Sequence, residues 1–349
     1  MQKTEEQTHR LKQIVSAITI FALFVLVFAI RHQIVETFRN LGQVNLWFLW
    51  LMPIMQIGNY HAYTQMYRHL LWILNERIRY RSMMRVQLEL NFVNNVFPSG
   101  GVSGISYFGL RMKDAQVTGG KSTLVQVMKF TLLFVSFQIF LGIGLLLLSF
   151  SGRTNNFLIM VVTTLSSFLL VGTLLFAYIM SNQNRINGFF TFITKILNRI
   201  IHVFRRKHPE TIKIDNVRAL FTELHEGYMV IKSDIRVLKK PLLFALLANT
   251  TEILTIYSVY MAFGEFVNPG AVIIAYAVAN FAGLISVLPG GVGVYEALMT
   301  GVLVAAGVPA ALSLPVTVMY RILNSLIQLP PGYYLYHKNL HKRQSKESD

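Results

Sequence analysis

The chain contains no cysteine among its 349 residues, which excludes disulfide bonds, thiol catalysis and thiolate metal sites. Charge is also scarce, because only 14% of the residues are charged whereas 53% are hydrophobic. A soluble domain of this length needs far more polar surface, so the composition indicates an integral membrane protein. We expect residues 1–349 to form a single polytopic membrane domain, without a water-soluble domain long enough for a conventional active site.

Acidic residues are half as frequent as basic ones, with 16 Asp and Glu against 32 Lys and Arg, which gives a net charge of +16. In a membrane protein such an excess usually lies on the cytoplasmic side and contacts anionic lipid, so nucleic-acid binding is not expected. Residues 182–240 form the longest polar interval, and their pattern predicts basic amphipathic helices at the cytoplasmic interface. Basic residues near both ends place the N and C termini in the cytoplasm, for a multi-pass protein of the cell membrane.

Signatures of catalysis are missing as well. The sequence has no Ser-His-Asp arrangement and no paired aspartates of a glycosyltransferase loop. His337 and His341 stand four residues apart, but no acid or cysteine joins them in a metal set. Residues 115–122 fit a relaxed phosphate-loop pattern, yet no strand precedes them and they lead into an apolar helix. We therefore predict no catalytic residue, no metal and no cofactor.

Long apolar runs predict an all-α fold with about six spanning helices. A helix needs about 20 mostly apolar residues to cross the hydrocarbon core of a bilayer. Lys and Arg residues in the intervening loops assign the cytoplasmic ends. The six predicted spans are residues 14–30, 46–67, 124–150, 157–180, 242–263 and 312–336.

Two further apolar segments, 88–110 and 271–307, carry helix-breaking sequences at their centres: Phe97–Gly104 and Leu288–Glu296. Proline removes a backbone donor and glycine removes side-chain constraint, so each helix should break there. Broken backbone survives at membrane depth only where protein or a water-filled cavity covers it. The first segment has basic residues at both ends and the second has none, which predicts two re-entrant hairpins inserted from opposite sides. An inverted-topology repeat leaves such a pair, and it places a substrate site near the midplane.

The motifs around these breaks resemble a known family. Residues 278–283 and 288–297, Ala306–Pro309 and Tyr320–Arg321 are similar to the membrane region of lysylphosphatidylglycerol synthase/flippase proteins, and residues 94–104 are similar to its upstream motif. The resemblance covers essentially the whole chain. It implies a stand-alone member without the aminoacyl-transfer domain of the fused enzymes. It also implies movement of a lipid, or of a lipid-linked substrate, between the two leaflets.

On this basis the Gly-rich tips would offer helix N-termini to a phosphate, and Arg111 and Arg321 would add charge-assisted contacts. Glu252 and Glu296 are candidates for proton or ion coupling. An alternative is that Glu296 and Arg321 form a purely structural ion pair. Lys129 is expected to snorkel to the interface. The predicted substrate-binding residues are Pro98, Gly100, Gly101, Gly104, Arg111, Asn280, Pro289, Gly290, Gly291, Gly293, Glu296 and Arg321.

Three functions remain open. The first is a lipid flippase-like transporter for an anionic phospholipid or a polyprenyl-phosphate-linked sugar, driven by a gradient, protons or the membrane potential. The second is a membrane-embedded transferase acting on a lipid carrier, with Glu296 as a base. The third is a non-transporting partner that binds a separate lipid synthase or glycosyltransferase through residues 185–240.

Overall fold

The computed structural model describes residues 30–97, 102–189, 191–192, 214–285 and 291–348, together with Phe21, Phe24, Val25 and Phe28. Within these residues there is no strand, and nearly all of the chain is helical. The predicted all-α fold is confirmed. The helices are α2 (Leu46–Leu49), α3 (Leu51–Ile73), α4 (Tyr80–Val96), α5 (Val102–Asp114), α6 (Gly119–Phe150), α7 (Asn156–Met180), α9 (Ile214–Ser233), the 3-10 helix η1 (Ile235–Leu238), α10 (Lys239–Ala262), α11 (Pro269–Ile285), α12 (Val294–Ala305) and α13 (Ala310–Ser348).

Four helical segments are long and apolar enough to cross a membrane: Gly119–Phe150, Asn156–Met180, Ile235–Ala262 and Ala310–Leu340. Helix α3 has 23 residues and packs along α10. It is more polar than these four, because Gln56, Asn59 and His61 lie on it. Most of the first predicted span, 14–30, lies outside the described residues. Six crossings therefore remain a prediction.

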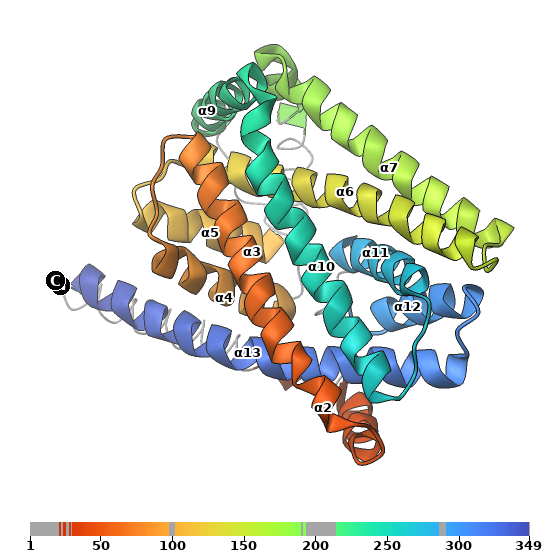
Figure 1. The fold of residues 1–349 in the computed structure, drawn as a ribbon. Helices are drawn as coiled ribbons and strands as arrows, with labels where there is room; N and C mark the ends of the chain where they lie inside the picture. The colour runs from red at the N-terminus through yellow and green to blue at the C-terminus, as the bar shows by residue number, and fades with distance from the viewer. Residues whose placement is uncertain are drawn as a thin grey trace, which may run out of the picture.

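The two predicted helix breaks occur where the proline-glycine motifs stand. Helix α4 ends at Val96 and α5 begins at Val102, while α11 ends at Ile285 and α12 begins at Val294. Gly291 and Gly293 have φ values of 67° and 85°, in the left-handed region where glycine is favoured. In Figure 1 the α4–α5 and α11–α12 pairs lie toward opposite ends of the bundle. Their depth in a membrane stays a prediction.

Close backbone approach fixes the second hairpin against α6. A Cβ on Gly270, near the start of α11, would lie 2.4 Å from the carbonyl oxygen of Gly144. Asn268 strengthens this contact between α11 and α6, because it donates a hydrogen bond to Ser151 Oγ at the end of α6. These contacts orient α11 along α6, and so bring its inner face toward the centre of the bundle.

The basic interval 182–240 only partly follows its predicted interfacial placement. In α9, Leu224 and Ile231 are buried, and a Cβ on Gly227 would meet Leu124 of α6 at 2.6 Å. This apolar face therefore packs on the protein. Residues 190 and 193–213 of the same interval lie outside the described residues.

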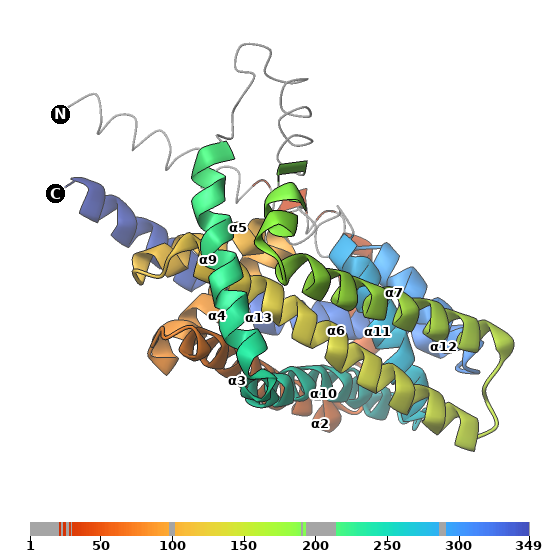
Figure 2. The same cartoon turned by 90° about the horizontal axis from the view of Figure 1, so that it is seen from above.

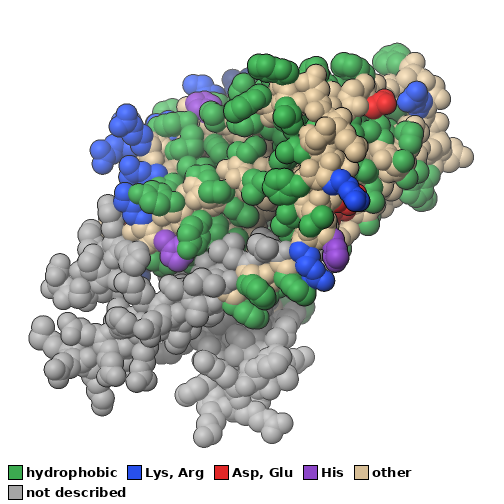
Figure 3. Space-filling model, turned by 90° about the horizontal axis from the view of Figure 1, so that it is seen from below, with side chains coloured by type: hydrophobic (Ala, Val, Ile, Leu, Met, Phe, Trp, Pro, Cys, Tyr) green, Lys and Arg blue, Asp and Glu red, His purple; other side chains and the backbone are tan. Residues whose placement is uncertain are grey.

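The outer faces have the character of a lipid-facing surface. Helix α7 forms one edge of the molecule in Figure 2, and several of its apolar side chains are exposed, among them Phe168, Val171 and Leu174. On the face seen in Figure 3, hydrophobic side chains cover much of the described surface, and Lys and Arg gather at the end where α13 finishes. That end is the one predicted to be cytoplasmic.

Gly332 of α13 gives a test of helix packing. A Cβ there would lie 2.5 Å from Leu88 O and 2.6 Å from Phe92 Cβ on α4. Gly332→Ala is therefore expected to lower the free energy of unfolding by about 1–3 kcal/mol through overpacking. Thermal unfolding of the detergent-purified protein measures the loss. Gly301→Ala on α12 is the matched control, since no atom lies within 4 Å of its Cβ; equal stabilities of the two variants would contradict the packing shown here.

Candidate functional site

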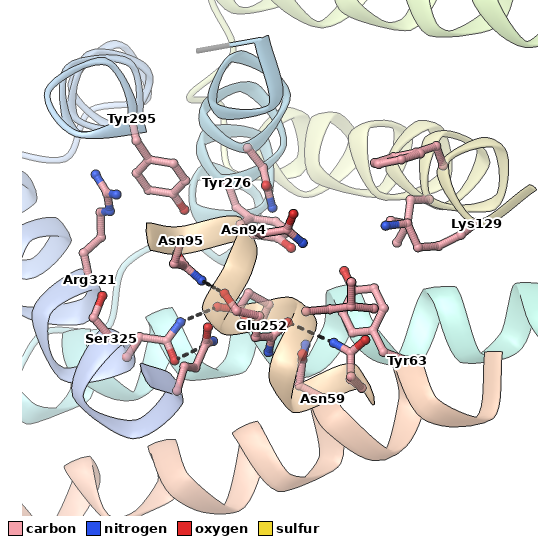
Figure 4. Close-up of a pocket in the computed structure, with 18 of the residues that line it drawn as sticks. Asn59, Tyr63, Asn94, Asn95, Lys129, Glu252, Tyr276, Tyr295, Arg321 and Ser325 are labelled. Atoms are coloured by element: carbon pink, nitrogen blue, oxygen red, sulfur yellow. Dashed lines mark hydrogen bonds between the residues drawn. The ribbon is translucent and has the colours of Figure 1, made fainter. Parts of the chain in front are cut away.

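A polar cavity of about 310 Å³ lies where the end of α4 meets α11 and α12. Helices α3, α6, α10 and α13 complete its walls, so both hairpins face it (Figure 4). Its lining is unusual for the interior of an apolar bundle, because amides, phenols and three charged side chains predominate. The lining residues are Asn59, Tyr63, Tyr67, Gln87, Leu90, Asn91, Asn94, Asn95, Lys129, Phe130, Leu133, Phe137, Glu252, Tyr276, Asn280, Tyr295, Tyr320, Arg321, Asn324, Ser325 and Gln328.

The three charged lining residues lie well inside their helices. Lys129, Glu252 and Arg321 follow the first residues of α6, α10 and α13 by 10, 13 and 11 positions. At about 1.5 Å per residue, each is on the order of 15–20 Å from the start of its helix. A helix of about 20 residues spans the hydrocarbon core, so none of the three charges lies at the first turn of its helix, where a side chain reaches the interface most easily. A charge inside a membrane is expensive and is by default a candidate for a functional site.

Glu252 is held by neutral donors. Gln56 Nε2 donates to Oε2 at 3.1 Å and Asn324 Nδ2 donates to Oε1 at 2.9 Å, while the Tyr320 hydroxyl also donates to Oε1. Gln328 extends the network by donating to Gln56 Oε1 at 3.1 Å. All of these contacts suit an ionised carboxylate, which only accepts hydrogen bonds.

Arg321 has a carboxylate partner. Its Nη1 lies 2.5 Å from Glu296 Oε1, and its guanidinium lies over the Tyr295 ring at 4.9 Å from the centroid. The other oxygen of Glu296 accepts a hydrogen bond from the Gly293 amide at 2.7 Å, as in a capping box. Glu296 is buried and does not line the cavity. The helix N-terminus at Gly293, predicted to receive a phosphate, is thus capped by the protein's own carboxylate.

Lys129 does not follow its prediction. Its side chain is only 9% exposed and lines the cavity, instead of reaching the interface. The ammonium lies 3.9 Å from the Phe130 ring centroid and 5.8 Å from that of Tyr67. The prediction was wrong because α6 starts at Gly119, about 15 Å of helix before Lys129. A lysine stem cannot cover that distance, so the charge stays in the interior.

A row of asparagines just before the first break was not predicted as part of the site. Asn91, Asn94 and Asn95 fall on one face of α4, at i, i+3 and i+4, and all line the cavity. Gln87 joins them one turn earlier and donates to Asn91 Oδ1 at 2.9 Å. The signal was present in the sequence, since such amide spacing inside an apolar segment predicts one polar face.

A second cavity of about 20 Å³ adjoins the first, and shares Asn95, Arg321 and Ser325 with it. Its other walls are Ile30 and Gln33 near the N-terminal helix, Val292 at the second break and Ile322. The smaller cavity therefore lies beside the main one, between α13, Val292 and the described part of the N-terminal helix. Within the described residues, no three His, Asp or Glu side chains form a group that could hold a metal ion.

Comparison with known proteins settles the family. A family model for the lysylphosphatidylglycerol synthase TM region matches residues 14–332. The chain belongs to this family. A UPF0104 membrane protein of Methanothermobacter thermautotrophicus is 38% identical over 98 residues, which are 28% of this chain and 29% of that protein. A UPF0104 membrane protein of Pyrococcus horikoshii is 22% identical over 187 residues, 52% of this chain and 54% of that protein. The matched segments cover no more than about half of either relative.

In this member of the lysylphosphatidylglycerol synthase TM-region family, the predicted site residues fall into three groups. Asn280, Glu252 and Arg321 line the cavity. Gly104, Gly291, Gly293 and Glu296 support it: a Cβ on Gly104 would clash with the Asn94 amide, Gly291 and Gly293 form the second break, and Glu296 pairs with Arg321. The remaining residues that were predicted at the two tips lie outside the described residues: Pro98, Gly100, Gly101, Pro289 and Gly290.

Arg111 belongs to none of these groups, because it lies away from the cavity. Its Nε lies 2.7 Å from Glu89 Oε2, and a second guanidinium nitrogen lies 3.2 Å from Asp114. Tyr107 also donates to Glu89, at 3.0 Å. This cluster ties α5 to α4 near the open end of the first hairpin. The sequence pointed to Arg111 because it follows the glycine cluster, but α5 carries it two turns beyond Gly104 and out of the site.

Proposed function

We propose that this protein is a lipid flippase-like transporter that moves an anionic phospholipid or a polyprenyl-phosphate-linked sugar between leaflets. The observation that carries the proposal is the polar cavity near the middle of the bundle, between two interrupted hairpins. A flippase must offer a headgroup a polar path while the acyl chains stay in hydrocarbon. Amides, phenols and fixed charges can replace the water that a headgroup loses in such a path.

Two further features support this proposal over a chemical role for Glu296. Both oxygens of that carboxylate are engaged, one by Arg321 and one by the Gly293 amide. A smaller cavity, lined also by Ile30 and Gln33, shares Asn95, Arg321 and Ser325 with the main one. A lipid whose chains remain in the bilayer requires a lateral opening, which we assign to the smaller cavity.

The proposal is tested by reconstituting the full chain into liposomes that contain a fluorescent anionic phospholipid or a fluorescent polyprenyl-phosphate-linked sugar. Exchange between leaflets is followed by chemical quenching of the outer leaflet. We expect exchange of at least one of these lipids well above the rate in empty vesicles. Exchange at the empty-vesicle rate for both lipids would contradict the proposal.

Filling the cavity should stop this exchange. Ser325 lines both cavities, so Ser325→Trp is expected to reduce the exchange rate at least tenfold by occupying the path. Ser167→Trp, at an exposed position of α7, introduces the same ring away from the cavity. Equal exchange by these two variants, at equal amounts of folded protein, would show that the path lies elsewhere.

A further inference from the structure

Lys129 stands out among the charged residues that line the cavity. Its side chain is more than nine-tenths buried, yet among the described residues its ammonium has cation–π contacts with Tyr67 and Phe130 and no hydrogen bond. No described carboxylate forms an ion pair with it. In Figure 4 its ammonium points from α6 into the space that Tyr63 and Asn94 also face. A buried cation without an anionic partner is costly, and such a group persists where a ligand supplies the partner.

The other two charges already have protein partners. Arg321 is paired with Glu296, and Glu252 is bonded by Gln56, Asn324 and Tyr320. Of the described groups in the cavity wall, Lys129 is therefore the cation whose charge the protein leaves unbalanced. The amides of Gln87, Asn91, Asn94 and Asn280 line the same cavity and can donate to anionic oxygens.

The cavity volume limits what this cation can receive. A cavity of about 310 Å³ lies at the lower end of the range of about 300–1,000 Å³ that small-molecule sites cover. One phosphate with a small polyol substituent fits within this room. A phosphate that carries several sugar rings would have to extend out of it.

We propose that Lys129 binds the phosphate of a phospholipid with a compact headgroup, at the α6 wall of the cavity. This inference rests on the proposed function and narrows its substrate class. It assigns phosphate recognition to Lys129 instead of the Gly-rich tips. Because the substrate supplies the missing negative charge, Lys129 is required for recognition and dispensable for folding.

The test compares Lys129→Gln, Lys129→Arg and a matched control, Lys121→Gln. Lys121 lies on the same helix, but it pairs with Glu76 at 2.6 Å outside the cavity. Binding is measured by the thermal stabilisation of the detergent-purified full chain with sn-glycerol 3-phosphate as the soluble probe. Leaflet exchange is measured in liposomes with fluorescent phosphatidylglycerol and, separately, with a polyprenyl-phosphate-linked oligosaccharide.

We expect Lys129→Gln to need at least a tenfold higher concentration of sn-glycerol 3-phosphate for the same thermal stabilisation. We also expect it to exchange phosphatidylglycerol at least tenfold more slowly. Lys129→Arg and Lys121→Gln should stay within threefold of the wild type. Without probe, Lys129→Gln should unfold at the same or a higher temperature than the wild type, because it removes an unpaired buried charge. A merely structural lysine would give a lower temperature and unchanged probe affinity.

The outcomes separate this inference from the proposed function. Exchange and probe binding that are unaffected by Lys129→Gln overturn the role of Lys129 and leave the transporter proposal standing. A wild type that exchanges no lipid, but loses probe binding on Lys129→Gln, overturns the transporter proposal and supports the phosphate site. Exchange of the oligosaccharide lipid in preference to phosphatidylglycerol overturns the compact-headgroup assignment.

Discussion

Replacing Glu296 by Gln is expected to lower the free energy of unfolding by about 3 kcal/mol, because Arg321 would stay buried without its anionic partner. The two side chains are 6% and 16% exposed, so little water is available to replace the lost interaction. Glutamine preserves the other role of the residue, since its carbonyl oxygen can still accept from the Gly293 amide in the capping box. The substitution therefore isolates the ion pair between α12 and α13. Unfolding of the purified protein in mixed detergent micelles measures the change.

The double variant Glu296→Gln/Arg321→Gln provides the control. It should lose less stability than the sum of the two single variants, with a coupling of about 1–3 kcal/mol for a contacting pair. Arg321 also lines the cavity whereas Glu296 does not. Arg321→Gln should therefore slow leaflet exchange per folded molecule, since it removes a cation from the cavity wall itself. Single variants as stable as the wild type would show that the pair does not hold the second hairpin to α13.

The helix breaks were predictable from the sequence because local chemistry determines them. Proline and glycine disrupt a helix wherever they occur in one, so the ends of α4 and α11 follow from the motifs alone. The ion pair between Glu296 and Arg321 was predictable for a related reason: a carboxylate and a guanidinium at membrane depth favour each other over solvation by lipid. What the motifs did not indicate was that Glu296 caps its own helix, because that depends on the backbone path through Gly293.

The position of Lys129 was not predictable from periodicity. Helix α6 is apolar on every side, so the sequence gives no sign of which face is directed inward. The distinction between a snorkelling and a cavity lysine depends on where the helix begins, and the apolar run suggested a start close to Lys129. The four extra residues Gly120–Thr123 and the preceding Gly119 extend the helix and bring Lys129 toward its middle. The polar face that the asparagines form on α4 could have been predicted from their spacing. It was missed because the glycines that follow it were taken as the binding site.

Glu252 adds a negative charge to the cavity wall, so removing that charge should raise the affinity for an anion. We expect Glu252→Gln to bind an anionic phosphate at least tenfold more tightly. A unit charge about 10 Å from the phosphate contributes about 1.7 kcal/mol at an effective dielectric constant of about 20, which corresponds to more than a tenfold change in Kd. The amide oxygen can still accept from Asn324 and Tyr320, and the amide nitrogen can donate to Gln56 once the Gln56 amide turns over, so the folded structure should persist.

Tighter binding should slow transport. A transport site must bind its substrate firmly enough for entry and weakly enough for release, and a carboxylate in the wall weakens the hold on an anion. Glu252→Gln is thus expected to exchange phosphatidylglycerol at least tenfold more slowly while it binds sn-glycerol 3-phosphate more tightly. Glu265→Gln, at an exposed position after α10, removes the same charge far from the cavity and should change neither quantity. Weaker phosphate binding by Glu252→Gln would mean that the carboxylate supports the anion indirectly, through the network around Gln56, and would refute the charge balance argued for this cavity.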